Sequence, residues 1–314
     1  MSEQATWLKA SEKGSVLGIR FVVWLATLAG RGPARLLVRV VALYYVVAHR
    51  DVRDASRRWL GRVHKRAATW RDIYQHVFRF AQVTLDKLFF MRGDSAGFVF
   101  NHTGAEHLRT LAKSGSGAIL LSAHMGNASA MSAGRHDQRL NISIAGYFKN
   151  AAMINAALSQ LDPASTARVV HISPGNPSAV LSIREKVEAG GMVAIAGDRV
   201  GLNERTVTVP FFGAPAQFPL APFVLAAVLK KPVFLVFALY HEPNRYELYC
   251  EPFAESLAVP RKDRQRHLTA HVARYAARLE HYARLAPDNW FNFYDFWNPT
   301  HASSEPAATE PTPP

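Results

Sequence analysis

From residue 117 onward, short unbroken apolar runs alternate with stretches of helical periodicity, and this alternation constrains the fold more than any other feature of the 314-residue chain. Strands of this kind, separated by helices, are typical of a mainly parallel sheet covered by helices on both faces. The sequence therefore predicts an α/β domain. The expected strands are 117–123, 140–146, 168–172, 192–197, 232–239 and 245–250, and the expected helices are 126–134, 151–161, 177–190, 218–230 and 263–286.

The last two expected strands are separated by only four residues, His241 to Asn244. A connection this short joins antiparallel neighbours. We therefore expect a mixed sheet, mainly parallel, with an antiparallel hairpin at one edge.

Two apolar stretches open the chain, residues 14–30 and 36–48, and each is interrupted by an arginine. Both are shorter than the roughly 20 residues that a spanning helix needs. Three interpretations stay open: a helical hairpin that turns at residues 31–34 and lies in the cytoplasmic leaflet, a pair of core helices, or a single span over 14–30. Because neither stretch ends in a small-residue cleavage site, a secretory signal is not expected.

The net charge of +13 is concentrated at the start of the chain, where the first 100 residues hold 17 Lys and Arg against 7 Asp and Glu. The sequence contains no zinc finger, RNA-recognition signature or basic heptad region, so nucleic acid is not the expected partner. Basic residues interleaved with apolar runs favour anionic lipid headgroups. We therefore expect residues 1–50 to form a membrane-associating helical region. The single cysteine, Cys250, excludes an internal disulfide.

Residues 69–91 repeat apolar side chains at three- and four-residue steps, which predicts an amphipathic helix packed on the core. The α/β domain is expected to cover residues 51–300. The tail 301–314 consists largely of Pro, Ala, Thr and Glu and has little to bury, so we expect it to be disordered.

His124 is the strongest candidate for chemistry among the 13 histidines, because it directly follows the apolar strand 117–123. Ligands of α/β sheets bind beyond the carboxyl ends of the strands. Gly126 allows a tight backbone turn there, and the amide groups of that turn are expected to face a developing anion.

The segment Leu120 to Asn127 resembles the first motif of the lysophospholipid acyltransferase superfamily, especially its lipid A lauroyl and myristoyl branch. That motif is a histidine followed five positions later by Asp or Glu. Four further blocks resemble the same family in the same order, and the likeness extends over roughly residues 10–298. They are Gly146–Asn150 with Asn155, Ala196–Arg199, Val209–Ala216 and Pro219–Pro222. The ending 289–297 resembles a subgroup of predicted acyltransferases.

The resemblance implies a fold like that of glycerol-3-phosphate acyltransferases and a location on the cytoplasmic face of the bacterial inner membrane. It also implies transfer of a fatty acyl group from acyl-CoA or acyl carrier protein to a lipid-like or glycolipid-like acceptor, with no bound cofactor. In this chemistry the histidine is the general base and the motif carboxylate orients its ring.

The chain departs from the motif at the carboxylate, because position 129 is a serine. Three interpretations stay open. Asp198, at the end of another strand, supplies the carboxylate; or His124 works slowly with Ser129; or the protein is a degenerate relative that binds acyl or lipid groups without turnover.

Six further residues are expected to bind substrate: Asn127, Lys149, Asn155, Arg199, Phe211 and Gly213. For Arg199, a phosphate contact and an ion pair with Asp198 are both open. Phe211 could line an acyl groove or pack in the core, and the cluster from Trp290 to Trp297 could lie at the bilayer interface or form a strap on the sheet. The sequence has no nucleophile elbow, P-loop or zinc helix, and we expect no metal site.

Overall fold

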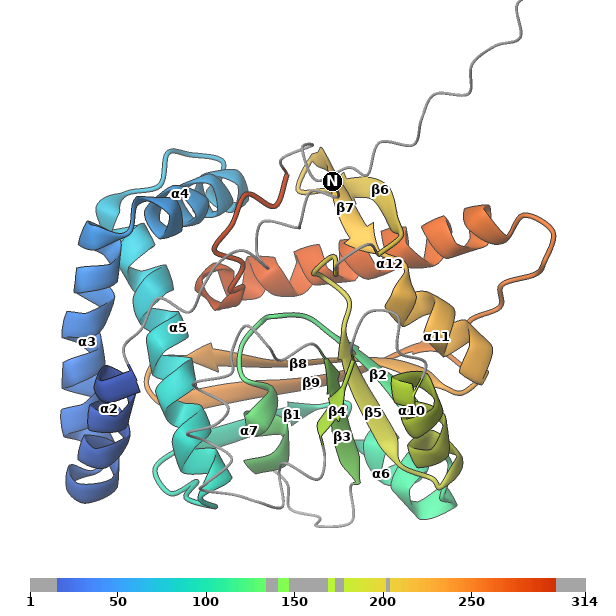
Figure 1. Cartoon of the computed structure of the whole chain (residues 1–314), viewed down its shortest axis with the longest axis horizontal. Helices are drawn as coiled ribbons and strands as arrows, with labels where there is room; N and C mark the ends of the chain where they lie inside the picture. Colours follow the sequence, from blue (N-terminus) through green and yellow to red (C-terminus); the bar gives the residue numbers. More distant parts are fainter. Residues whose placement is uncertain (1–15, 134–140, 147–168, 173–177, 202–203, 298–314) are drawn as a thin grey trace, which may run out of the picture.

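The computed structural model describes residues 16–133, 141–146, 169–172, 178–201 and 204–297. It is an α/β fold in which helices flank a central sheet (Figure 1). The predicted helix 151–161, Lys149, Asn155 and the tail 301–314 lie outside the described residues.

Within the described residues, the central sheet has seven strands in the order β1-β9-β8-β2-β5-β3-β4. Their bounds are β1 Val99–Thr103, β2 Ala118–Ser122, β3 Ile142–Gly146, β4 Val169–His171, β5 Met192–Ala196, β8 Val233–His241 and β9 Arg245–Ala254. All neighbouring pairs are parallel except β8 and β9. The predicted mainly parallel, mixed sheet is confirmed.

The β8–β9 hairpin is confirmed, but its predicted place at a sheet edge is wrong. Strand β1 pairs in parallel with β9 and forms that edge. Strand β1 was not predicted, because the segment VFNHT is short and mostly exposed and therefore carries no apolar run. Only its pairing with β9 identifies it as a strand.

Alternate residues of β2 face two different cores, as the pleat of a strand requires. Ile119 and Leu121 join a large cluster with α10 (Ser178–Glu188), α11 (Ala221–Leu229) and α12 (Arg264–Leu285). Ala118 and Leu120 pack on the other face with Leu108 of α6 (Ala105–Ser114). Both faces of the sheet are therefore covered, which is why β2 consists of consecutive apolar residues.

A second, two-stranded sheet is formed by β6 (Thr206–Phe211) and β7 (Ala214–Pro219). The predicted helix 218–230 therefore begins late, at Ala221. Residues 214–219 pair with β6, and no local pattern in the sequence shows that pairing.

The N-terminal helices are α2 (Val16–Ala29) and α3 (Arg31–Ala48), with α4 (Arg50–His64) and α5 (Trp70–Met91) after them. Figure 1 shows α5 between α3 and the sheet. The inner face of α3 carries a repeat of small and apolar side chains, Ala34, Val38, Ala42 and Val46, which are buried in one cluster with α5. The predicted helix 69–91 is confirmed as α5.

The turn predicted at residues 31–34 is wrong, because the chain turns at Gly30, which has a φ of 79°. Pro33 falls in the first turn of α3, where backbone amides have no partner within the helix, so proline is tolerated there. None of the helices in the described ranges is long and apolar enough to cross a membrane, so the single span over 14–30 is not supported.

Candidate active site

Parallel pairing brings His124 and Asp198 together at the same edge of the sheet. Ser122 is paired with Ala196, the last residues of β2 and β5. His124 and Asp198 each lie two residues beyond this pair. Because neighbouring parallel strands end side by side, the two side chains emerge next to each other.

The carboxylate of Asp198 binds His124 at two places. The ring nitrogen Nδ1 lies 2.8 Å from Oδ1, and the backbone amide of His124 donates to both carboxylate oxygens at 3.1 Å. An ionised carboxylate only accepts hydrogen bonds, so Nδ1 carries the proton and Nε2 has its lone pair available. No described residue is hydrogen-bonded to Nε2, and 37% of the His124 side-chain surface is exposed.

The charges of the pair are set by opposing effects. Burial, the largest effect, and the positive charge of Arg199 lower the pKa of His124, although Asp198 opposes them. Burial by itself raises the pKa of Asp198, but His124, Arg199 and Asn292 outweigh it and hold that pKa at about 2. At neutral pH the site therefore holds a neutral imidazole against a buried carboxylate, the state that a general base requires.

The loop after β2 is fixed by backbone contacts on both sides. Gly126 has a φ of 61°, and a Cβ there would lie 1.8 Å from the carbonyl oxygen of Ala238. Its amide donates to the Asn289 carbonyl, and the amide of Asn127 donates to the Ala238 carbonyl. The expectation that these amides face a developing anion is therefore wrong, because they are already used within the protein.

Asn127 is buried, and its side chain serves the protein rather than a ligand. Its Oδ1 accepts from the Ser129 amide at the start of α7 (Ala128–Ala133), and its Nδ2 donates to the Val83 carbonyl at 3.2 Å. The predicted substrate contact is therefore replaced by a role in holding the loop after His124.

Ser129 forms no hydrogen bond with His124 among the described residues. Nδ1 is bound to Asp198 instead. Of the three interpretations of the missing motif acid, the geometry favours the one in which Asp198 supplies the carboxylate.

The segment 289–292 is a strap that lies against the loop carrying His124. The amide of Phe291 donates to the His124 carbonyl at 2.8 Å. The indole Nε1 of Trp290 and the amide Nδ2 of Asn292 donate to Oδ2 of Asp198 at 3.0 and 2.9 Å. Trp290 is only 1% exposed. Of the two interpretations of this segment, a strap or an interfacial segment, the structure shows the strap at Trp290.

Trp290 and Asn292 are residues of the site that the sequence did not predict. The sequence indicated the aromatic cluster from Trp290 to Trp297 as a strap or an interfacial segment, but a tryptophan between two asparagines does not reveal which carboxylate these side chains contact.

Arg199 binds the strap as well. Its Nε donates to Oδ1 of Asn292 and its Nη2 to the carbonyl of Phe291, both at 2.7 Å. Asn292 thus lies between Arg199 and Asp198, and no direct ion pair between these two described residues is seen.

Phe211 and Gly213 belong to the β6–β7 hairpin. Phe211 is fully buried among other aromatic rings, so it packs in the core and does not line a groove. Phe212 and Gly213 have φ values of 48° and 76° and form the two-residue turn, which explains the glycine. The structure does not bring either predicted binding residue to His124.

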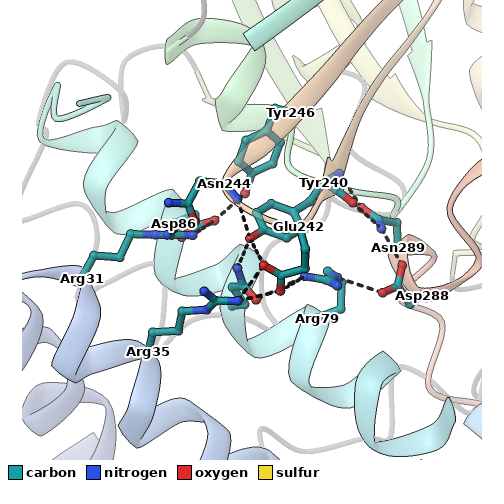
Figure 2. Close-up of polar contacts among 11 residues, drawn as sticks. Arg31, Arg35, Arg79, Asp86, Tyr240, Glu242, Asn244, Tyr246, Asp288 and Asn289 are labelled. Atoms are coloured by element: carbon teal, nitrogen blue, oxygen red, sulfur yellow. Dashed lines mark hydrogen bonds and ion pairs between the residues drawn. The ribbon is translucent and has the colours of Figure 1, made fainter. Parts of the chain in front are cut away.

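A polar network joins the N-terminal helices to the sheet close to this site (Figure 2). Arg31 of α3 binds both oxygens of Asp86 at 2.7 and 3.0 Å, and Tyr246 donates to the same carboxylate at 2.8 Å. Asp86 is completely buried.

A second branch of the network runs through Glu242, which binds Arg35 at 2.6 Å and Arg79 at 2.9 Å. Arg79 also binds Asp288, which accepts from the side chain of Asn289. Figure 2 shows this branch as far as Asn289. The Asn289 carbonyl accepts from the amide of Gly126, so the branch reaches the loop that carries His124.

In the described ranges, no group of three or more His, Cys, Asp or Glu side chains could hold a metal ion. A family model described as "Bacterial lipid A biosynthesis acyltransferase" matches residues 17–298. No curated protein matches the chain.

Proposed function

The chain belongs to the family of bacterial lipid A biosynthesis acyltransferases, and we propose that it moves a fatty acyl group from a thioester to a lipid-like or glycolipid-like acceptor. The proposed donors are acyl-CoA or acyl carrier protein. The proposed location is the cytoplasmic face of the bacterial inner membrane.

The observation that carries this proposal is the 2.8 Å contact between Nδ1 of His124 and Asp198. Nε2 of His124 takes the proton of the acceptor hydroxyl or amine as that group attacks the thioester carbonyl. The C–S bond then breaks, and the imidazolium returns the proton to the departing thiolate. Asp198 holds the ring in the required tautomer and stabilises its positive charge in between.

The degenerate, non-catalytic alternative was motivated by the serine at position 129. The geometry argues against that alternative, because the buried carboxylate of Asp198, two residues beyond the end of β5, lies beside the ring. No observation now favours the alternative over acyl transfer.

Membrane association is supported by the outer faces of α2 and α3. Their large apolar side chains Phe21, Trp24, Leu28, Leu36, Val40, Leu43, Tyr44 and Val47 are each more than half exposed. Exposed apolar groups gathered on neighbouring helices mark an interaction surface. We propose that this surface lies in the headgroup region of the bilayer, parallel to the membrane plane.

The proposal is tested by acyl transfer and thioester hydrolysis with labelled acyl-CoA and acyl carrier protein. We expect Asp198→Asn to lower the rate by about 10⁴, as loss of the triad carboxylate does in other acyl-transfer sites, and His124→Ala to lower it at least as much. Ser129→Ala is the control and should stay within about threefold of wild type, because its side chain does not contact the ring. Robust turnover by His124→Ala would show that the site is wrong.

A further inference from the structure

The buried carboxylate of Asp198 accepts hydrogen bonds from three residues. His124 contributes its ring and backbone N–H groups, and the strap contributes the Trp290 indole and the Asn292 amide. Both strap donors are neutral and both bind Oδ2, which leaves Oδ1 for the ring of His124. The strap thereby determines which oxygen faces the proposed base.

The orientation of the Asn292 amide is fixed by its two partners. Its Oδ1 accepts from Nε of Arg199, which can only donate, and its Nδ2 donates to Asp198, which can only accept when ionised. If the amide were flipped, its NH₂ group would face the N–H donor of Arg199 and its oxygen would face the carboxylate of Asp198. Asn292 therefore keeps the guanidinium and the carboxylate on opposite ends of one amide.

Hydrogen bonds to a carboxylate weaken its attraction for a proton on the neighbouring ring. The other groups that face the pair are Arg199, which lowers the pKa of His124, and the phenols of Tyr275 and Tyr294. Burial raises the pKa of both phenols, so they are neutral at physiological pH. The Tyr275 hydroxyl donates to the Ser122 carbonyl. Apart from His124 itself, the Trp290 indole and the Asn292 amide are thus the neutral side chains of the described residues that donate directly to Asp198, at 3.0 and 2.9 Å.

We propose that Trp290 and Asn292 are positioning residues whose N–H groups hold Oδ2 of Asp198 and thereby set the pH above which His124 acts as a base. This inference rests on the proposed function for its catalytic meaning. The effect on the protonation of His124 is a property of the resting protein and can be measured without activity.

The experiment compares Trp290→Phe with Trp297→Phe in the full chain. Both tryptophans belong to the same aromatic cluster, but the Trp297 indole donates to the Phe211 carbonyl and does not contact Asp198. The titration of His124 is followed by NMR of ¹⁵N-labelled histidine and assigned with His124→Gln. The acid limb of kcat/KM is measured alongside.

We expect Trp290→Phe to raise the pKa of His124 by about 0.5 to 1 unit, a roughly threefold to tenfold tighter binding of the proton. The acid limb should move to higher pH by the same amount, with little change in KM. Trp297→Phe should leave both unchanged. A replacement of the Trp290 indole by benzothiophene, which removes only the N–H, should reproduce the shift if Trp290→Phe is too unstable to study.

An unchanged or lowered pKa of His124 in both position-290 variants would overturn the inference, because Trp290 would then only pack. If the shift occurs but His124→Ala retains activity, the proposed function fails while the effect of the strap on the pair stands.

Discussion

At the scale of single residues, backbone geometry accounts for Gly126 in a way that the sequence could only suggest. The positive φ and the 1.8 Å approach of a Cβ to the Ala238 carbonyl oxygen are separate reasons for glycine at this position. Gly213 also has a positive φ, of 76°, but a Cβ there meets no atom within 4 Å. A substitution at Gly213 therefore measures the cost of the backbone conformation alone. A substitution at Gly126 measures that cost together with the clash against Ala238.

We predict that Gly126→Ala lowers the free energy of unfolding by about 3 kcal/mol or more, because backbone atoms cannot yield as a flexible side chain does. Gly213→Ala should lower it by only about 1 to 2 kcal/mol, the cost of a left-handed conformation for a residue with a Cβ. Urea denaturation measures both. Equal losses for the two variants would contradict the assigned role of the close approach.

At the scale of elements, the polar network of Figure 2 explains how α3 is joined to α5 and to the β8–β9 hairpin. Arg31 keeps 17% of its side-chain surface exposed, whereas Asp86 is completely buried. Removing one member of such a pair leaves a charge without a partner in a region of low polarity. Removing both avoids that cost.

We predict that Asp86→Leu lowers the free energy of unfolding by about 3 kcal/mol, and that Arg31→Met combined with Asp86→Leu is more stable than Asp86→Leu alone. The exposed pair Arg184 and Glu188 is the control, and Arg184→Met should leave the free energy of unfolding nearly unchanged. A double-mutant cycle in urea gives the coupling energy. A strictly additive cycle would contradict the importance of the pair.

At the scale of the whole molecule, α2 and α3 lie on the side of α5 that faces away from the sheet (Figure 1). Large apolar side chains of both helices, among them Trp24 and Leu36, are more than half exposed. The opposite face of α3 is filled by its packing on α5. The two helices thus have an inner face that stabilises the protein and an outer face that is free to contact another apolar phase.

We predict that Trp24→Ser, Leu36→Ser and Leu43→Ser together reduce binding to vesicles of phosphatidylethanolamine and phosphatidylglycerol at least tenfold, because each loses apolar area that the bilayer would bury. Val180→Ser with Leu181→Ser on α10 is the control, since these residues are also exposed. Flotation of vesicles with bound protein is the measurement. Equal loss of binding from both surfaces would argue against the outer face of α2 and α3 as the membrane contact.

The sequence predicted the elements that have a local pattern of apolar residues, either an unbroken run or a helical repeat. The unbroken apolar strands β2, β5 and β8, with helices such as α5 and α12 between or around them, follow from periodicity alone. Strand β1 and the β6–β7 hairpin were missed because their side chains are partly exposed and their identity depends on partners distant in the chain.

The sequence by itself determined the α/β class and the place of His124 just beyond β2, because a strand that is buried on both faces requires a continuous apolar run. Only the tertiary structure decided which carboxylate serves the ring. Asp198 is 74 positions away, and Trp290 and Asn292 lie farther still. Parallel pairing and the returning strap bring these groups together. The number of residues between these groups does not reveal that they are close in space. That number depends on the length of the segments that connect the strands.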